Sequence, residues 1–155
     1  MHALLQLRLD ILEFKKVKFK FPEKMFNNIL TSKINNLNRI TKDGMVGIKR
    51  GGAKFIADIY LEMMDAYSYL YKEILSFIPP KKGAQYIKSF KKSMEGVAGP
   101  LLLEISKLKL ESQNVLAKNK ILSDSGSKLF SSSKKYTPYL NIGNSLLMMD
   151  KAKRR

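Results

Sequence analysis

Three acidic residues have the type and spacing that suit chemistry. Asp58, Glu62 and Asp65 recur four and three residues apart, so a helix places their carboxylates on one side. Such a group can hold a cation or act in acid–base catalysis. Helical metal sites usually add histidine, and the only histidine of this chain is His2. Because basic residues outnumber acidic ones by 29 to 13, we interpret the three carboxylates as a solvated face that pairs with neighbouring cations.

A second candidate is the segment IKRGGAK, residues 48–54, where two glycines precede an expected helix. Backbone amides at such a point can bind phosphate, but the sequence lacks the spacing of a P-loop and the strand before it. We therefore interpret the segment as a turn into the helix. Tyrosines that can stack on nucleic-acid bases stand at helical spacing, and we assign them to core packing; they are Tyr60, Tyr67, Tyr69 and Tyr71.

No serine, threonine or lysine is accompanied by an evident base, and the sequence has no cysteine and no Gly-x-Ser-x-Gly elbow. The sequence therefore predicts a protein that is not an enzyme. We assign no catalytic, metal-binding or cofactor-binding residue.

Positive charge is the unusual feature of the composition. The formal net charge is +16, and lysine supplies most of it. Such a charge favours an acidic protein surface, a nucleic acid or an anionic membrane as partner. Arginine, which suits bidentate contacts with phosphate and guanine, is scarce, so we favour the acidic protein and keep the other two as alternatives. The candidate partner-binding residues stand in the segment SFIPPKKGAQYIKSFKK, residues 76–92; they are Lys81, Lys82, Lys88, Lys91 and Lys92.

The elements that position these residues follow from the spacing of apolar side chains. We expect a helix over residues 2–15, an extended connector where KKVKFKF alternates lysine with apolar residues, and a second helix from Glu23 to a stop near Thr41–Gly44. The strongest pattern predicts a helix from Ala53 to Phe77. Its two apolar stripes require cover on two sides, so this helix should be central.

Pro79 and Pro80 should end the central helix. A helix from Gln85 to Glu95 should follow, and Pro100 should then start, or kink, a further helix to about Leu122. We expect an all-α fold of five to six antiparallel helices, built as hairpins in a solenoid-like array. Residues 1–122 should form one domain, and residues 123–155 a polar linker and basic tail with a short helix at 144–149. Charges interrupt each apolar tract, so we expect no secretory or transmembrane segment.

The order of these features resembles a helical segment of tetratricopeptide-repeat (TPR) proteins of bacterial envelopes, some of them linked to gliding motility, over about residues 26–120. The TPR period and its tryptophan are not visible in the sequence. The resemblance implies a TPR-like scaffold module for protein–protein interaction, without cofactor and in the periplasm or cell envelope. The residues themselves leave the compartment open, with the cytoplasm as the alternative. It rests on Ala53, Tyr60, Tyr67, Pro79, Pro80, Tyr86 and Pro100.

Overall fold

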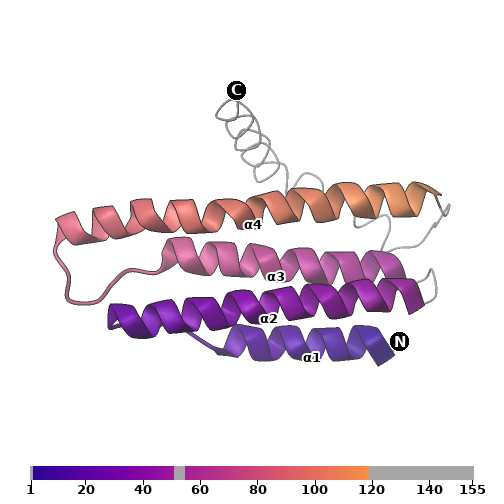
Figure 1. The fold of residues 1–155 in the computed structure, drawn as a ribbon, viewed down its shortest axis with the longest axis horizontal. Helices are drawn as coiled ribbons and strands as arrows, with labels where there is room; N and C mark the ends of the chain where they lie inside the picture. Colours follow the sequence, from indigo (N-terminus) through magenta and orange to yellow (C-terminus); the bar gives the residue numbers. More distant parts are fainter. Residues whose placement is uncertain (1, 51–54, 119–155) are drawn as a thin grey trace, which may run out of the picture.

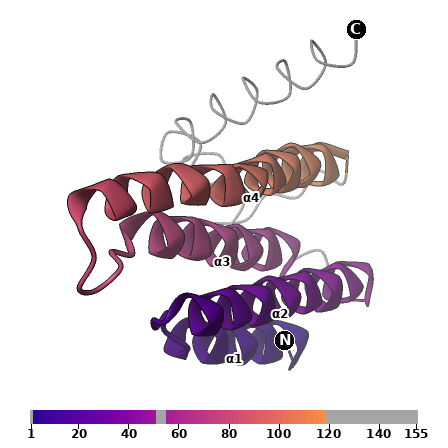
Figure 2. The same ribbon diagram turned by 60° about the vertical axis from the view of Figure 1, so that its left-hand side comes forward.

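The computed structural model describes residues 2–50 and 55–118, and this part of the chain consists of four α-helices without strands. They are α1 (His2–Lys16), α2 (Glu23–Arg50), α3 (Ile56–Ser76) and α4 (Ala84–Lys118). Successive helices run antiparallel, so that α1–α2 and α3–α4 form two hairpins (Figures 1 and 2). The all-α prediction is confirmed, and none of the four helices is long and apolar enough to cross a membrane.

The central position predicted for the third helix is also confirmed, because α3 packs against each of the other three helices. Side chains on two sides of α3 are fully buried, among them Met63, Met64, Ala66 and Leu70. A helix that is apolar over so much of its circumference is stable only when neighbours cover it on both sides. The hairpin partner α4 covers one side, while α1 and α2 cover the other.

The predicted end of the second helix near Gly44 is wrong, because α2 continues through this glycine to Arg50. Gly44 is buried, and a Cβ atom added to it would lie only 2.5 Å from Sδ of Met63. The glycine therefore lets α2 approach α3 closely and does not cap a helix. Close packing against a neighbouring helix outweighs the weak helix propensity of a single glycine, which costs about 1 kcal/mol.

The predicted break before Pro100 is wrong as well, since α4 runs from Ala84 to Lys118 with this proline inside it. Proline inside a helix removes one hydrogen bond and costs about 3 kcal/mol. The apolar face of α4 is continuous across the proline, with Met94 and Ala98 before it and Leu102 and Ile105 after it, and all four are buried. Packing of this face against α3 offsets the local cost.

Four helices therefore occupy the described residues, where the sequence predicted five to six over the whole chain. The predicted linker and tail at residues 123–155, with the short helix at 144–149, lie outside the described residues. Residues 51–54 and the predicted end of the domain at residue 122 also lie outside the described residues.

Candidate anion-binding end of the helical bundle

Two segments that are far apart in the sequence lie at one end of the bundle. They are the connector between α1 and α2, residues 17–22, and the turn between α3 and α4, residues 77–83 (Figures 1 and 2). Aromatic rings join them. The ring centroid of Phe21 lies 5.8 Å from that of Phe77, 5.9 Å from that of Phe90 and 6.4 Å from that of Tyr86. Aromatic pairs at such distances add to the energy of burial, so this cluster fixes the connector against the turn.

Alternation along the connector separates its aromatic residues from its lysines. Phe19 is buried and stacks on Phe26 at a centroid distance of 4.6 Å, whereas Lys18 and Lys20 are exposed. The predicted non-helical connector is confirmed. Val17 does not follow this alternation of buried apolar residues and exposed lysines, because it is 44 % exposed.

The turn between α3 and α4 presents lysines because of its prolines. Helix α3 ends at Ser76, and Phe77 is already extended. Pro79 could not continue the helix, because it lacks a backbone N–H and its ring would clash with the carbonyl four residues earlier, and Ile78, which precedes it, avoids helical geometry. Lys81 adopts a left-handed conformation with φ of 57°, which turns the chain toward the start of α4. The backbone N–H of Ile87 donates to the carbonyl of Gly83 at 3.1 Å in the first turn of that helix. The predicted helix–helix connector is confirmed.

The five predicted lysines are all exposed, and we call them the turn lysines: Lys81, Lys82, Lys88, Lys91 and Lys92. Three of them, at positions 88, 91 and 92, share one face of α4 because they are three and four residues apart. Lys82 places Nζ 4.8 Å from the ring centroid of Tyr86. No acidic residue occurs between Glu73 and Glu95 in the sequence.

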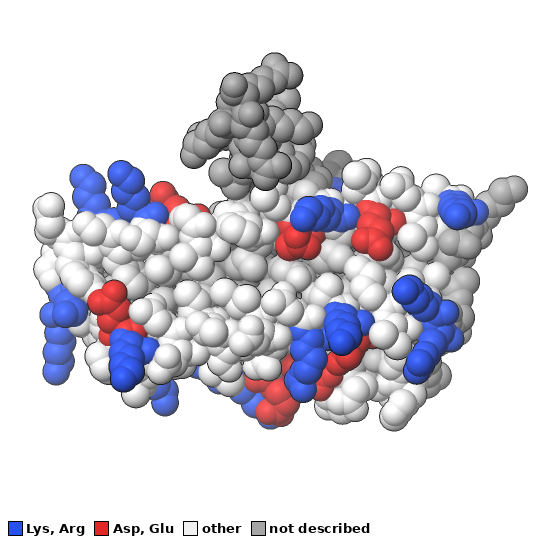
Figure 3. All heavy atoms as spheres, in the orientation of Figure 1, with Lys and Arg blue, Asp and Glu red and all other residues white. Residues whose placement is uncertain are grey.

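Among the ion pairs that join described residues, none includes a turn lysine. Figure 3 shows basic side chains at this end of the molecule with acidic ones beside them, and further basic side chains occur elsewhere on the same face. Acidic residues border this surface, because Glu95 follows Lys91 by four residues on α4 and Glu23 accepts a hydrogen bond from the hydroxyl of Tyr86 at 3.4 Å. The turn lysines therefore form an exposed basic surface that has acidic residues at its edge.

A buried polar cluster, which the sequence analysis missed, lies behind the connector. Lys33 is only 1 % exposed, and its Nζ donates to the backbone carbonyl of Phe14 and to Oε2 of Glu73, each at 3.1 Å. The same Nζ lies 4.6 Å from the ring centroid of Phe14 and 5.6 Å from that of Phe19. Lys33 thus ties the end of α1, the connector and α3 together.

Burial is the main cause that lowers the pKa of Lys33; the neighbouring charge of Lys18 lowers it further, while Glu73 opposes both. The side chain of Glu73 is 14 % exposed, and its Oε1 is buried without a hydrogen-bond partner among the described residues. Lys18 contacts the hydroxyl of Tyr69, and this hydrogen bond raises the pKa of Lys18. The sequence does contain a sign of this cluster, because Lys33 interrupts the apolar stripe that includes Phe26. A charged residue at such a position predicts either that its side chain is buried or that the helix breaks there.

The acidic face of α3 forms ion pairs with α1. Arg8 Nε lies 2.7 Å from Oε1 of Glu62, and Lys15 Nζ lies 2.7 Å from Oδ2 of Asp65. These contacts confirm the predicted pairing with neighbouring cations for two of the three carboxylates. Within residues 2–50 and 55–118, no group of three potential ligands is placed to hold a metal ion.

Two of the four tyrosines assigned to core packing, Tyr60 and Tyr67, are buried as predicted, and each hydroxyl has a polar partner. Tyr69 and Tyr71 are only partly buried and pack against the edge of the core. Tyr60 donates to Oε1 of Glu111 at 3.0 Å, and Tyr67 shares a hydrogen bond with Thr41 at 2.9 Å. Burial raises the pKa of both tyrosines above the ordinary value of 10.0. Their hydroxyls therefore remain neutral and serve packing.

No protein-family model, curated protein or solved structure matches this chain.

Proposed function

We propose that the protein is a non-catalytic interaction module that binds the acidic surface of a partner protein at the end described above. The observation that carries the proposal is the exposure of all five turn lysines on one turn and the first turns of α4. The aromatic cluster around Phe21 adds the exposed Lys20 of the connector to the same end. Cations held on a fixed framework bind with a smaller loss of conformational freedom than cations on a flexible segment.

The two hairpins support the scaffold part of this proposal. Antiparallel helix pairs that pack side by side are also the units from which solenoid arrays are built. We therefore extend the proposal to a TPR-like array, in keeping with the resemblance to envelope proteins, in which these hairpins would continue in further helices of the same kind. On this proposal, the module has no cofactor.

Binding of nucleic acid is the first alternative. Lysine binds phosphate as a point charge, so the turn lysines suit a nucleic-acid backbone as well. Arginine, which gives the bidentate contacts that read bases, is not among them. A nucleic acid would therefore be bound without sequence preference and with a strong dependence on salt.

Binding to an anionic membrane is a second candidate function, and a specific observation favours it. Leu5, Leu9 and Leu12 of α1 are 52–56 % exposed, and their spacing of four and three residues places them on one face of the helix. Lys16 follows them at the same spacing and is exposed as well. An amphipathic helix with leucine and lysine on its outer face can lie in a membrane interface. The predicted membrane-binding end at Leu146–Met149 lies outside the described residues.

Three labelled probes separate these functions: a glutamate-rich peptide, a duplex DNA of random sequence, and vesicles that contain phosphatidylserine. Fluorescence anisotropy measures binding of the first two, and vesicle flotation measures the third. The test variant replaces four turn lysines with glutamate, Lys81, Lys82, Lys91 and Lys92. The control variant makes the same change of charge in exposed residues of α2, namely Arg39, Lys42, Lys49 and Arg50, all replaced by glutamate.

We expect the wild type to bind the glutamate-rich peptide and the test variant to bind it at least about tenfold more weakly, which corresponds to about 1.4 kcal/mol. The control variant should lose much less, because its charges lie away from the turn. Equal losses in both variants would show that net charge alone causes binding and would overturn the proposed site. Tighter binding of DNA or of vesicles than of the peptide would favour the respective alternative.

A further inference from the structure

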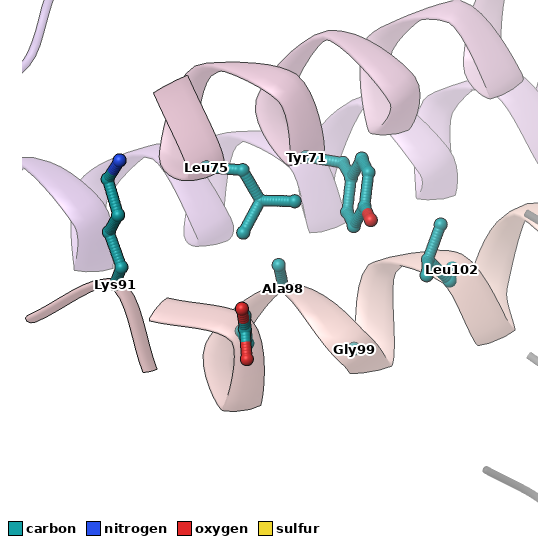
Figure 4. A pocket seen from close by; sticks show the side chains of 7 residues that line it. Tyr71, Leu75, Lys91, Ala98, Gly99 and Leu102 are labelled. Carbon is teal, nitrogen blue, oxygen red and sulfur yellow. The ribbon is translucent and has the colours of Figure 1, made fainter. Parts of the chain in front are cut away.

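A cavity of about 440 Å³ lies between α3 and α4, next to the turn lysines. Tyr71 and Leu75 of α3 line one side of it, and Ala98, Gly99 and Leu102 of α4 line the other. Figure 4 shows Tyr71 and Leu75 projecting toward the backbone of α4 at Ala98 and Gly99. The volume falls within the range of about 300–1,000 Å³ that is usual for ligand pockets.

Two charged residues of α4, Lys91 and Glu95, stand at the edge of the cavity, and both are exposed. Lys91 is also one of the turn lysines. The face of α4 that carries Lys88, Lys91 and Lys92 therefore continues directly into an apolar recess. The cavity exists because Ala98 and Gly99 have small or no side chains opposite the larger residues of α3.

We propose that this cavity holds one large apolar side chain of an acidic peptide, while the turn lysines bind the carboxylates that flank this side chain. The inference rests on the proposed function and names its partner class: an acidic segment with a leucine or phenylalanine anchor. A buried apolar anchor surrounded by weaker polar contacts is the usual anatomy of a binding hot spot.

Charge decides between possible occupants. Glu95 disfavours a carboxylate inside the cavity, so the anchor is uncharged and the acidic groups lie toward the turn. A second copy of this chain is a poor occupant, because each copy carries a formal net charge of +16. Residues 119–155 of the same chain are also a poor occupant, because they are mostly basic among their charged residues.

The test uses two glutamate-rich peptides that differ only in one central residue, phenylalanine or alanine, and measures their affinities by fluorescence anisotropy. Gly99→Leu places a side chain at the cavity, whereas Gly96→Leu makes the same exchange on the same helix where an added Cβ meets no atom within 4 Å. Both exchanges replace a helical glycine with a better helix former. Circular dichroism checks that each variant keeps its helicity. If Gly99→Leu loses helicity, Leu75→Gln takes its place as the test variant, because it makes the wall of the cavity polar.

For the wild type and Gly96→Leu, we expect the phenylalanine peptide to bind about tenfold more tightly than the alanine peptide, as for an anchor residue. The difference should disappear in Gly99→Leu or Leu75→Gln. If the wild type binds both peptides equally, the cavity is not used, and the inference fails while the lysine site remains. If the wild type binds neither peptide, the proposed function itself fails. A tenfold difference that persists in the cavity variants would place the anchor elsewhere and overturn the inference.

Discussion

Replacement of Lys33 with methionine should strongly destabilise the protein, although the two side chains are similar in length. The exchange removes the partner of Glu73 Oε2, whose neighbour Oε1 is already buried without a partner among the described residues. Loss of one member of a buried ion pair costs about 3–5 kcal/mol. Because Glu73 keeps 14 % exposure and Lys18 lies nearby, we expect the lower end, about 3 kcal/mol. For a chain of this size, the melting temperature should fall by roughly 6–12 °C.

Glu73→Leu should cost less, about 1–3 kcal/mol, because Lys33 keeps its hydrogen bond to the carbonyl of Phe14 and can lose its proton. Removal of Glu73 also removes an interaction that raises the pKa of Lys33. Between this lowered pKa and the ordinary value of 10.5, the unfolded chain binds a proton that the folded chain does not. The stability of Glu73→Leu relative to wild type should therefore rise as the pH approaches 10.5 from below.

The double variant Lys33→Met, Glu73→Leu decides whether the pair is coupled. It should unfold with a free energy within about 1 kcal/mol of the wild type, because well-packed apolar residues often replace a buried ion pair without loss. Urea unfolding followed by circular dichroism gives all four free energies of the cycle. If the losses of the two single variants simply add, or if Lys33→Met is as stable as wild type, the buried pair does not exist in the form described.

Further predictions concern helix packing and titration. Gly44→Ala should lower the free energy of unfolding by about 1–3 kcal/mol through overpacking. Gly47→Ala should raise it by up to about 1 kcal/mol, because the new Cβ would have its nearest contacts at 3.4 Å. Equal effects of the two exchanges in urea unfolding would contradict the packing explanation. Pro100→Ala should raise the free energy of unfolding by about 1–3 kcal/mol, because it restores a helical hydrogen bond, and a loss of stability would show that the proline supports α4. Above pH 10.0, the ordinary pKa of tyrosine, the unfolded chain loses protons that buried Tyr60 and Tyr67 retain, so stability should fall. Replacement of both by phenylalanine should flatten this fall in unfolding curves measured between neutral and alkaline pH, and an unchanged slope would contradict the assignment.

The sequence predicted those helices whose limits follow from strong local signals. The Ala53–Phe77 pattern corresponds closely to α3, because two apolar stripes precede two prolines. The predictions failed at Gly44 and Pro100, where local propensity and tertiary packing disagree. Neither the approach of Met63 to Gly44 nor the continuous contact of α4 with α3 can be derived from a window of neighbouring residues, since both depend on residues of another helix.

The same limit applies to the candidate site. The turn lysines were recognisable because prolines and a glycine surround Lys81 and Lys82, and helical spacing leaves Lys88, Lys91 and Lys92 outside. The approach of Phe21 to Phe77 joins positions separated by more than fifty residues, and no pattern along the sequence encodes it. The cavity beside Lys91 likewise requires the register between α3 and α4.

Lys33 connects the stability of the bundle with the position of its lysines. Its Nζ bonds to the last turn of α1 and to α3, and it lies over the ring of Phe19 in the connector. Phe19 and Phe21 both stand against Phe77 of the turn, at centroid distances of 5.9 and 5.8 Å. A buried polar contact is directional, whereas an apolar contact is not. The ion pair between Lys33 and Glu73 therefore favours one position of the connector over other positions that would bury a similar apolar area. On this argument, the buried charge contributes less to stability than to fixing where the exposed charges lie.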